Sequence, residues 1–201
     1  MIRQTLEYDF TQEKGTDYPS MTADQAIKRI CRFVSGIWQI HPFAEGNTRT
    51  TAVFTMKYLQ TFGFKVDNTT FKNHSWYFRN ALVRANYNEF YKGISAIDTF
   101  LIKFFENLLL GKTNVLSNRE MHISNVQSLT PKSHNDTLNC TLDELALLKF
   151  LKENPSAKQE DIAKYIGKSL STVKRMTPVL IEKGLLHREN GKRNGRRVVK
   201  I

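Results

Sequence analysis

Residues 40–51 decide the fold, and they read Ile40-His41-Pro42-Phe43-Ala44-Glu45-Gly46-Asn47-Thr48-Arg49-Thr50-Thr51. One apolar pattern with helical spacing runs into this stretch and another runs out of it, which predicts a short bend between two helices. Within nine positions the bend gathers an imidazole, a carboxylate, a Gly-Asn pair and a guanidinium. These are the groups that phosphoryl or nucleotidyl transfer requires.

Each of these groups has a specific chemical use. His41 can accept a proton near neutral pH. Glu45 offers a hard oxygen ligand of the kind that Mg²⁺ prefers, together with phosphate oxygens and water. Gly46 and Asn47 tolerate left-handed backbone, so their N–H groups can form an anion nest in front of the next helix, whose positive end also attracts phosphate. Arg49, in the first turn of that helix, can make a forked contact with phosphate oxygens.

This stretch resembles the signature of the Fic family, H-x-F-x-[D/E]-G-N-x-R-x-x-R, and positions 41, 43, 45, 46, 47 and 49 all match it. The resemblance extends more loosely over residues 1–123 as an all-helical domain. It implies an enzyme that moves AMP, or a related phosphate-containing group, from a nucleotide such as ATP to a hydroxyl of a target protein.

The resemblance also implies a role for each matching residue. His41 would deprotonate the Ser, Thr or Tyr hydroxyl of the target, and Phe43 would anchor the loop in the core. Glu45 would hold Mg²⁺ between the nucleotide phosphates. The nucleotide would be bound by the residues that follow, namely Gly46, Asn47, Thr48 and Arg49.

Two positions depart from the family pattern. Ala52 stands where the family often has a second arginine, which holds the terminal phosphate of ATP. Thr48 stands where Gly or Lys is common. Without the second arginine, the cation that usually orients the triphosphate is missing. Nucleotide binding through the rest of the loop is still expected.

Two regulatory elements of the family are not found in the sequence. The family's β-hairpin flap lies upstream of the segment that corresponds to residues 1–10, and everything before His41 is read as helix and turn. The flap is therefore either lost or belongs to a part of the domain that this chain lacks. The inhibitory motif [S/T]-x-x-x-E-[G/N] is approached only at Ser156 and Glu160, where Ser156 is better read as a helix N-cap. Any inhibition is expected from a partner protein, another contact or a missing segment.

Length and composition restrict the class of protein. At 201 residues the chain suits one large or two small domains. No apolar run approaches the ~20 residues of a membrane span, and residues 1–10 lack the apolar block of a signal peptide. Cys31 and Cys140 lie far apart without a partner pattern, which predicts free thiols in a reducing compartment. We therefore expect a cytoplasmic protein that acts at no membrane.

The remaining histidines lack neighbouring ligands and are read as ordinary polar residues: His74, His122, His134 and His187. The net charge of +11 is concentrated at the end of the chain, because residues 141–201 carry +7 of it. This bias indicates an acidic partner for that part, with nucleic acid as the first candidate and ordinary solubility charge as the alternative.

The periodicity predicts a mainly α protein, an all-helical bundle followed by a small winged-helix domain. The Fic-like domain is placed at residues 1–111, a linker at 112–140 whose residues 114–123 pack back on the first domain, and a winged helix-turn-helix domain at 141–201. The first part of this domain is predicted as a helix end at 1–10, a turn at 15–20, a capping box at Thr22 and a helix from Asp24 that delivers His41. After the bend come a helix that carries Val53 and that Gly63 ends, and a polar connection at 64–72. A helix over 73–91 with Trp76 inward and a helix from Ile97 that Gly111 closes complete the domain.

The last domain is predicted from three helices and a hairpin. Thr141 caps the first helix, Pro155-Ser156 opens the second, and Ser169 or Ser171 caps the third. Residues 185–188 and 196–201 read as two strands joined by a basic turn. This pattern resembles a winged helix-turn-helix domain.

Contact with DNA is predicted through two groups of residues. The N-terminal end of the third helix would enter a major groove with Ser171, Thr172, Lys174 and Arg175. The wing would contact phosphates with Lys192, Arg193, Arg196 and Arg197. Pro178 is expected to kink or shorten the third helix, which leaves protein contacts or homodimerisation as an alternative role for the module.

Three hypotheses follow from the sequence. The first is a transferase in which His41 activates a target hydroxyl for attack on a nucleotide held by the loop. The second is a DNA-binding regulator whose Fic-like domain only senses nucleotide or binds a partner. The third is a transferase that uses another donor, such as a different nucleotide or a phosphocholine carrier.

Overall fold

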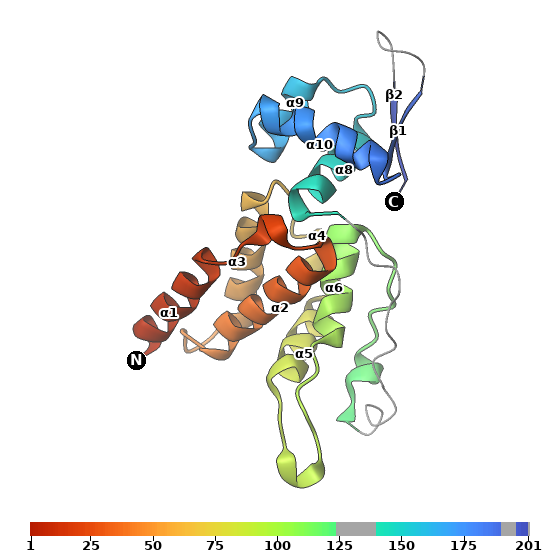
Figure 1. Ribbon diagram of the computed structural model, residues 1–201. Helices are drawn as coiled ribbons and strands as arrows, with labels where there is room; N and C mark the ends of the chain where they lie inside the picture. The colour runs from red at the N-terminus through yellow and green to blue at the C-terminus, as the bar shows by residue number, and fades with distance from the viewer. Residues whose placement is uncertain (124–139, 190–195, 201) are drawn as a thin grey trace.

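The computed structural model describes residues 1–123, 140–189 and 196–200 and shows two packed parts, a helical part and a smaller part at the C-terminal end (Figure 1). The helical part contains α1 (Ile2–Lys14), η1 (Tyr18–Ser20), α2 (Ala23–Gln39), α3 (Asn47–Thr61), α4 (Thr69–Asn73), α5 (Ser75–Asn86), η2 (Phe90–Lys92), α6 (Thr99–Leu110) and η3 (Asn118–Met121). The second part contains α8 (Leu142–Glu153), α9 (Gln159–Ile166), α10 (Leu170–Glu182), β1 (Leu186–Glu189) and β2 (Arg196–Val199). The predicted fold class, mainly α with a small winged-helix domain, is confirmed.

Helix α2 lies at the centre of the helical part. Its start is fixed by the predicted capping box, in which Thr22 and Gln25 each bond the other's backbone N–H. Its apolar stripe, including Ile27, Ile30 and Val34, is buried. Through this stripe α2 packs against α1, α3, α5, α6 and α8, so its C-terminal end is held firmly where the motif loop begins.

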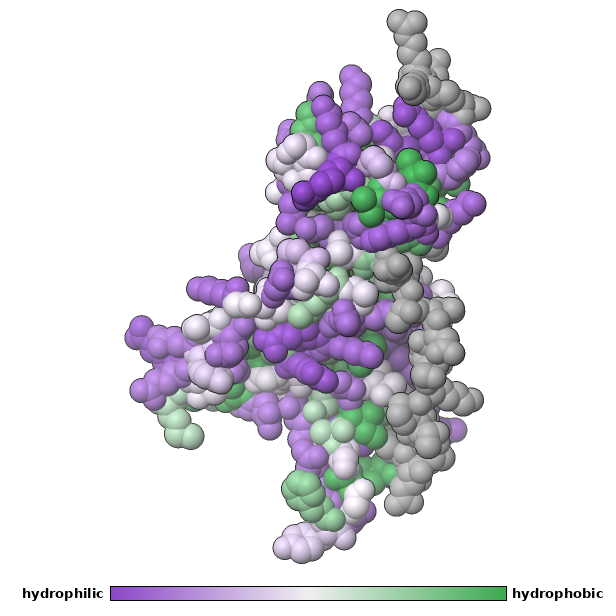
Figure 2. All heavy atoms as spheres, in the orientation of Figure 1, coloured by the Kyte–Doolittle hydropathy of each residue, from purple (hydrophilic) through white to green (hydrophobic). Residues whose placement is uncertain are grey.

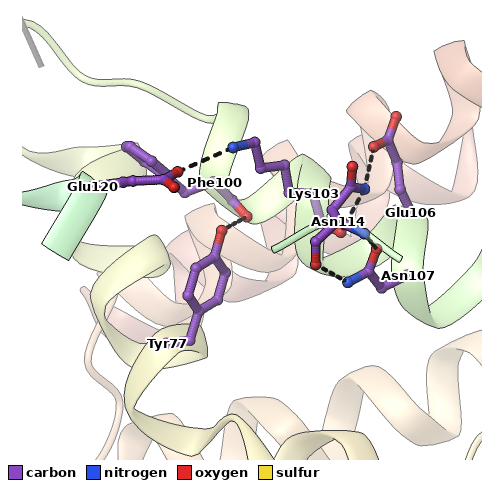
Figure 3. A network of polar contacts seen from close by, with 7 residues as sticks. All are labelled: Tyr77, Phe100, Lys103, Glu106, Asn107, Asn114 and Glu120. Carbon is purple, nitrogen blue, oxygen red and sulfur yellow. Dashed lines mark hydrogen bonds and ion pairs between the residues drawn. The ribbon is translucent and has the colours of Figure 1, made fainter. Parts of the chain in front are cut away.

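Residues 112–121, which follow α6, are bonded to the helical part. Asn107 and Asn114 bond each other reciprocally, with Asn107 Nδ2 donating to Asn114 O and Asn114 N donating to Asn107 Oδ1, each at 2.8 Å (Figure 3). Lys103 Nζ pairs with Glu120 at 3.2 Å, and Tyr77 donates to the carbonyl of Phe100. These bonds join the segment to α6, and α6 to α5.

The C-terminal part has the element order expected of a winged helix. Thr141 caps α8 in a capping box with Glu144, and Ser169 caps α10. Strands β1 and β2 are antiparallel, with Leu186 opposite Val199. The turn between the strands lies outside the described residues.

The two parts share one hydrophobic core, which continues from α2, α5 and α6 into α8, α9 and α10. Ala23 N at the start of α2 donates to Cys140 O at 2.7 Å. Gly63, with φ +82°, follows α3, and a Cβ there would lie 3.0 Å from Ile166 Cα. Glycine is therefore needed at this position both for its backbone angle and for the close approach of α9. The predicted domain boundaries at residues 111 and 141 remain a prediction.

Several predicted element bounds are wrong. Helix α1 continues to Lys14. The connection at 64–72 is not simply polar, because Phe64, Val66 and Phe71 are buried in it. The helix predicted over 73–91 ends at Asn86, and the chain then forms a projecting finger with one β-bridge between Glu89 and Ile94 and with η2 at its tip (Figure 1).

Other wrong predictions concern single side chains. Trp76 is 68% exposed, although it was expected to point inward. Lys158, not Ser156, is the N-cap of α9. Helix α10 continues through Pro178 to Glu182, so the proline does not shorten it.

Both cysteines are free and buried, as predicted. Among the described residues no helix is long and apolar enough to cross a membrane. His134 and residues 190–195 of the predicted wing turn lie outside those residues.

A buried carboxylate connects α1 to the helices on either side of the motif loop. Glu13, which is 5% exposed, accepts hydrogen bonds from the hydroxyls of Tyr18 and Tyr58 and pairs with Arg29 at 2.9 Å. Burial, followed by the hydrogen bond to Glu13, raises the pKa of both tyrosines, so they remain protonated donors. This cluster joins α1, η1, α2 and α3.

We predict that Glu13→Ala lowers the free energy of unfolding by about 2–3 kcal/mol, because it leaves Arg29 and two tyrosine hydroxyls without their acceptor. The measurement is urea unfolding followed by circular dichroism. Glu7→Ala is the matched control, because Glu7 pairs with Arg3 on the exposed side of the same helix and such pairs contribute little. Equal losses in the two variants would contradict the structural role of Glu13.

Candidate functional site

The loop between α2 and α3 has the strained backbone expected of a tight bend. His41 has φ +47° and Gly46 has φ +76°, which are left-handed values. Gly46 adopts this conformation readily, whereas a non-glycine residue such as His41 pays about 1–2 kcal/mol for it. The surroundings of His41 must therefore hold it in place.

Asn47 holds the loop together through both ends of its amide. Its Oδ1 accepts from the backbone N–H of Phe43 at 3.0 Å, and its Nδ2 donates to the carbonyl of Phe43 at 2.6 Å. The predicted phosphate contact by Asn47 is therefore limited to its backbone N–H. Phe43 is 52% exposed, so the prediction that its ring anchors the loop in the core is wrong. The amide of Asn47 fixes the backbone of Phe43 instead.

The start of α3 offers unpaired donors to an anion. No side chain caps α3, and its first turn has no acidic residue, so its first N–H groups lack helical partners. Gly46 turns the chain just before them. The Arg49 guanidinium lies over the turn, with Nη2 3.7 Å from where a Cβ of Gly46 would be. The left-handed Gly46, the uncapped start of α3 and the Arg49 guanidinium thus lie together, while phosphate binding there stays a prediction.

The imidazole of His41 has a defined orientation. Its Nδ1 lies 3.3 Å from the carbonyl oxygen of Gln39. Because a carbonyl only accepts, this contact is a hydrogen bond when Nδ1 carries the proton, and a neutral ring in that tautomer has its lone pair on Nε2. His41 is exposed, so a substrate hydroxyl can reach Nε2. This is the arrangement that a general base requires.

Thr48 has a structural role that the sequence did not show. Its Oγ1 accepts a hydrogen bond from Trp38 Nε1 at 3.1 Å. The oxygen accepts this bond while the O–H remains a donor, so the predicted nucleotide contact at Thr48 can use its hydroxyl or its backbone N–H. Ala52, one turn further along α3, is partly buried against the core and supplies packing in place of a cation.

The donor set fits a magnesium ion that arrives with phosphates. Glu45 is exposed beside the nest and offers one carboxylate. The described residues contain no group of three or more His, Cys, Asp or Glu side chains that could hold a metal ion, either at this loop or in other parts. Mg²⁺ commonly takes one or two carboxylates and completes its shell with phosphate oxygens and water. Glu45 is therefore the residue that would hold the ion.

The N-terminal end of α10 presents two of the four predicted DNA contacts freely. Lys174 and Arg175 are exposed. The hydroxyls of Ser171 and Thr172 instead lie 2.7 and 2.8 Å from Ser169 Oγ in the helix cap. The visible face of this part is mostly hydrophilic (Figure 2).

The predicted wing contacts are only partly available. Arg196 is exposed and lies 3.9 Å from Glu189. Arg197 donates to the carbonyls of Pro155 and Ala157 through its backbone and side chain, and burial lowers its pKa. It therefore fastens β2 to the connection before α9, and its contact with phosphate stays a prediction, because the guanidinium has further N–H donors. Lys192 and Arg193 lie outside the described residues.

Comparison with known families gives two matches. The model of the Fic/DOC family matches residues 2–59, and that of the MarR family matches residues 140–198. The chain combines a Fic domain with a C-terminal winged helix. No curated protein and no solved structure matches it. The Fic match ends within α3, and so includes the whole motif loop.

We predict that Asn47→Ala destabilises the Fic motif loop, because it removes both side-chain bonds to Phe43. The free energy of unfolding should fall by about 1–2 kcal/mol, and the amide of Phe43 should exchange with solvent faster. Hydrogen exchange followed by NMR measures the second effect directly. Thr50→Ala, which changes an exposed residue of the same turn, is the control. An unchanged exchange rate at Phe43 would show that Asn47 does not hold the loop.

Proposed function

We propose that the Fic domain transfers a nucleotide-derived phosphate group, AMP in the simplest case, to a hydroxyl of a target protein. The observation that carries the proposal is the convergence of the left-handed Gly46, the uncapped start of α3 and the Arg49 guanidinium beside an exposed His41. The first three supply an anion site, and the last supplies a proton acceptor next to it.

In the proposed reaction, Nε2 of His41 takes the proton from the target hydroxyl. The hydroxyl oxygen then forms a bond to the α-phosphorus of ATP, the bond from that phosphorus to the bridging oxygen breaks, and pyrophosphate leaves. The N–H groups at Gly46 and the start of α3, with Arg49, bind and orient the phosphates. Glu45 would hold Mg²⁺, which when bound neutralises phosphate charge.

The residue at position 52 bears on the choice of donor. Because Ala52 provides no cation, the terminal phosphate of a triphosphate is held less firmly than in a loop with the second arginine. A donor of another kind, such as a different nucleotide or a phosphocholine carrier, therefore competes with ATP as the substrate of the same loop. A thermal-shift series of donors with Mg²⁺ separates these possibilities.

We predict that incubation with α-labelled ATP, Mg²⁺ and cell lysate labels a protein, and that His41→Ala reduces the label at least about 100-fold by removing the general base. His74→Ala, which removes an exposed histidine at the start of α5, should leave the label unchanged. Transfer that survives His41→Ala, or no transfer with any donor in the series, would reject the proposal.

The second candidate is a DNA-binding regulator in which the Fic domain senses nucleotide without transferring it. The observation in its favour is the winged-helix order of the C-terminal part, with Lys174 and Arg175 exposed at the start of α10. The N-terminal end of a recognition helix is the part that approaches DNA in this class of module.

We predict that the double change Lys174→Ala and Arg175→Ala weakens DNA binding and lowers the slope of log K against log salt concentration by about 2, because two phosphate contacts are lost. Fluorescence anisotropy over a salt series gives this slope. Lys57→Ala with Lys72→Ala removes the same charge from exposed positions of the Fic domain and should leave the slope unchanged. Absence of DNA binding at low salt would reject this candidate.

A further inference from the structure

Trp38 touches both ends of the motif loop. It lies in the last turn of α2, and its Nε1 donates to Thr48 Oγ1 at 3.1 Å in the first turn of α3. Its ring meets the imidazole of His41 edge-on, with ring centroids 4.8 Å apart and an interplanar angle of 65°. Its carbonyl accepts from the backbone N–H of His41 at 3.2 Å. One residue therefore contacts His41 twice and closes the loop across to α3.

The backbone of His41 makes these contacts significant. A left-handed φ at a non-glycine residue is unfavourable and persists only when its surroundings hold it. Only one polar contact of the imidazole, from Nδ1 to the carbonyl of Gln39, is found within the described part of the chain, and at 3.3 Å it is long. The indole lies edge-on against the same ring, so it restricts rotation away from this weak bond.

We propose that Trp38 is a positioning residue for His41. Its indole holds the imidazole with Nδ1 toward Gln39 and Nε2 toward solvent, while its N–H fixes the start of α3 relative to that ring. The consequence of this position for catalysis rests on the proposed function, in which Nε2 is the base. The geometric part, an imidazole held in one tautomer by Trp38, does not.

Two other roles for Trp38 make different predictions. As a simple core residue it would need only bulk, and loss of its contacts would lower stability without changing the tautomer of His41. As a platform for a nucleotide base it would contribute to binding, so its removal would raise KM while kcat stays the same. A positioning residue affects the tautomer and kcat.

The test uses the full chain with ¹⁵N-labelled histidine. We expect the ring ¹⁵N shifts of His41 to show the Nδ1–H tautomer in the wild type and a mixture with Nε2–H in Trp38→Leu. If the labelled transfer is observed, Trp38→Leu should lower kcat about tenfold or more, with KM for ATP within about twofold of the wild type. Trp76→Phe, at the other and exposed tryptophan, is the matched control and should change neither quantity.

The two contacts of the indole can be separated. Trp38→Phe keeps an aromatic ring beside His41 and removes the N–H, and Thr48→Val removes its acceptor with little change in shape. Both variants should keep the Nδ1–H tautomer and should show equally faster hydrogen exchange at the N–H of Thr50, which donates to the carbonyl of Gly46 in the first turn of α3. A change of tautomer in Thr48→Val would mean that loop closure, and not the ring contact, orients His41, which would overturn the proposal.

A fluorescence measurement keeps the proposal testable even if Trp38→Leu does not fold. In the Trp76→Phe background the only indole is Trp38, and protonation of an adjacent imidazole quenches indole emission. Acidification should therefore quench Trp38 emission, and His41→Gln should abolish this response. The proposal is overturned if His41→Gln leaves the response intact, or if Trp38→Leu folds and leaves the tautomer unchanged. Neither result depends on transferase activity, so failure of the proposed function would be seen separately.

Discussion

The structure depends first on the buried apolar face of α2. Through buried residues such as Ile27, Ile30 and Val34, α2 packs against four other helices of the Fic part, α1, α3, α5 and α6, and against α8 of the winged helix. At the N-terminal end of α2, Ala23 N donates to Cys140 O, just before the winged helix begins. Because one end and the whole length of α2 are packed, its other end is a rigid support for the motif loop. A strained bend can persist there, since the packing around it fixes the chain on both sides.

Within the loop, some side chains hold the shape of the backbone and others are exposed to solvent, where a ligand can reach them. The side chains of Asn47 and Thr48 bond other parts of the loop and its flanking helices, so they hold its shape. The groups left exposed are the imidazole of His41, the carboxylate of Glu45 and the guanidinium of Arg49. Among the described residues no side chain caps the backbone N–H groups at the start of α3. A loop that satisfies its own polar side chains in this way is preorganised for an anion and needs little rearrangement to bind one.

The winged helix and the Fic domain are physically continuous. Helix α3 starts in the motif loop beside Gly46 and is followed by Gly63, where the missing side chain lets the backbone of α9 approach closely. Lys149 of α8 donates to the carbonyl of Leu108 near the end of α6, and burial lowers the pKa of this lysine. The same hydrophobic core passes through both parts. Two family matches on one chain therefore correspond to one packed body across the described residues, with the motif loop and α10 at different places on it.

The sequence by itself determined the features that depend on near neighbours: the capping boxes at Thr22 and Thr141, the helical stripes, the left-handed Gly46 and the grouping of His41, Glu45 and Arg49. Such features follow from local backbone chemistry and periodicity. Only the tertiary structure decided which aromatic rings are buried, because burial depends on partners distant in the chain. Phe43 and Trp76 are exposed for this reason, while Phe64 and Phe71 enter the core from a segment that looked polar. The contacts of Trp38 could not be predicted for the same reason. Its partners, His41 and Thr48, lie in and after a bend whose geometry does not follow from the spacing of residues in the sequence.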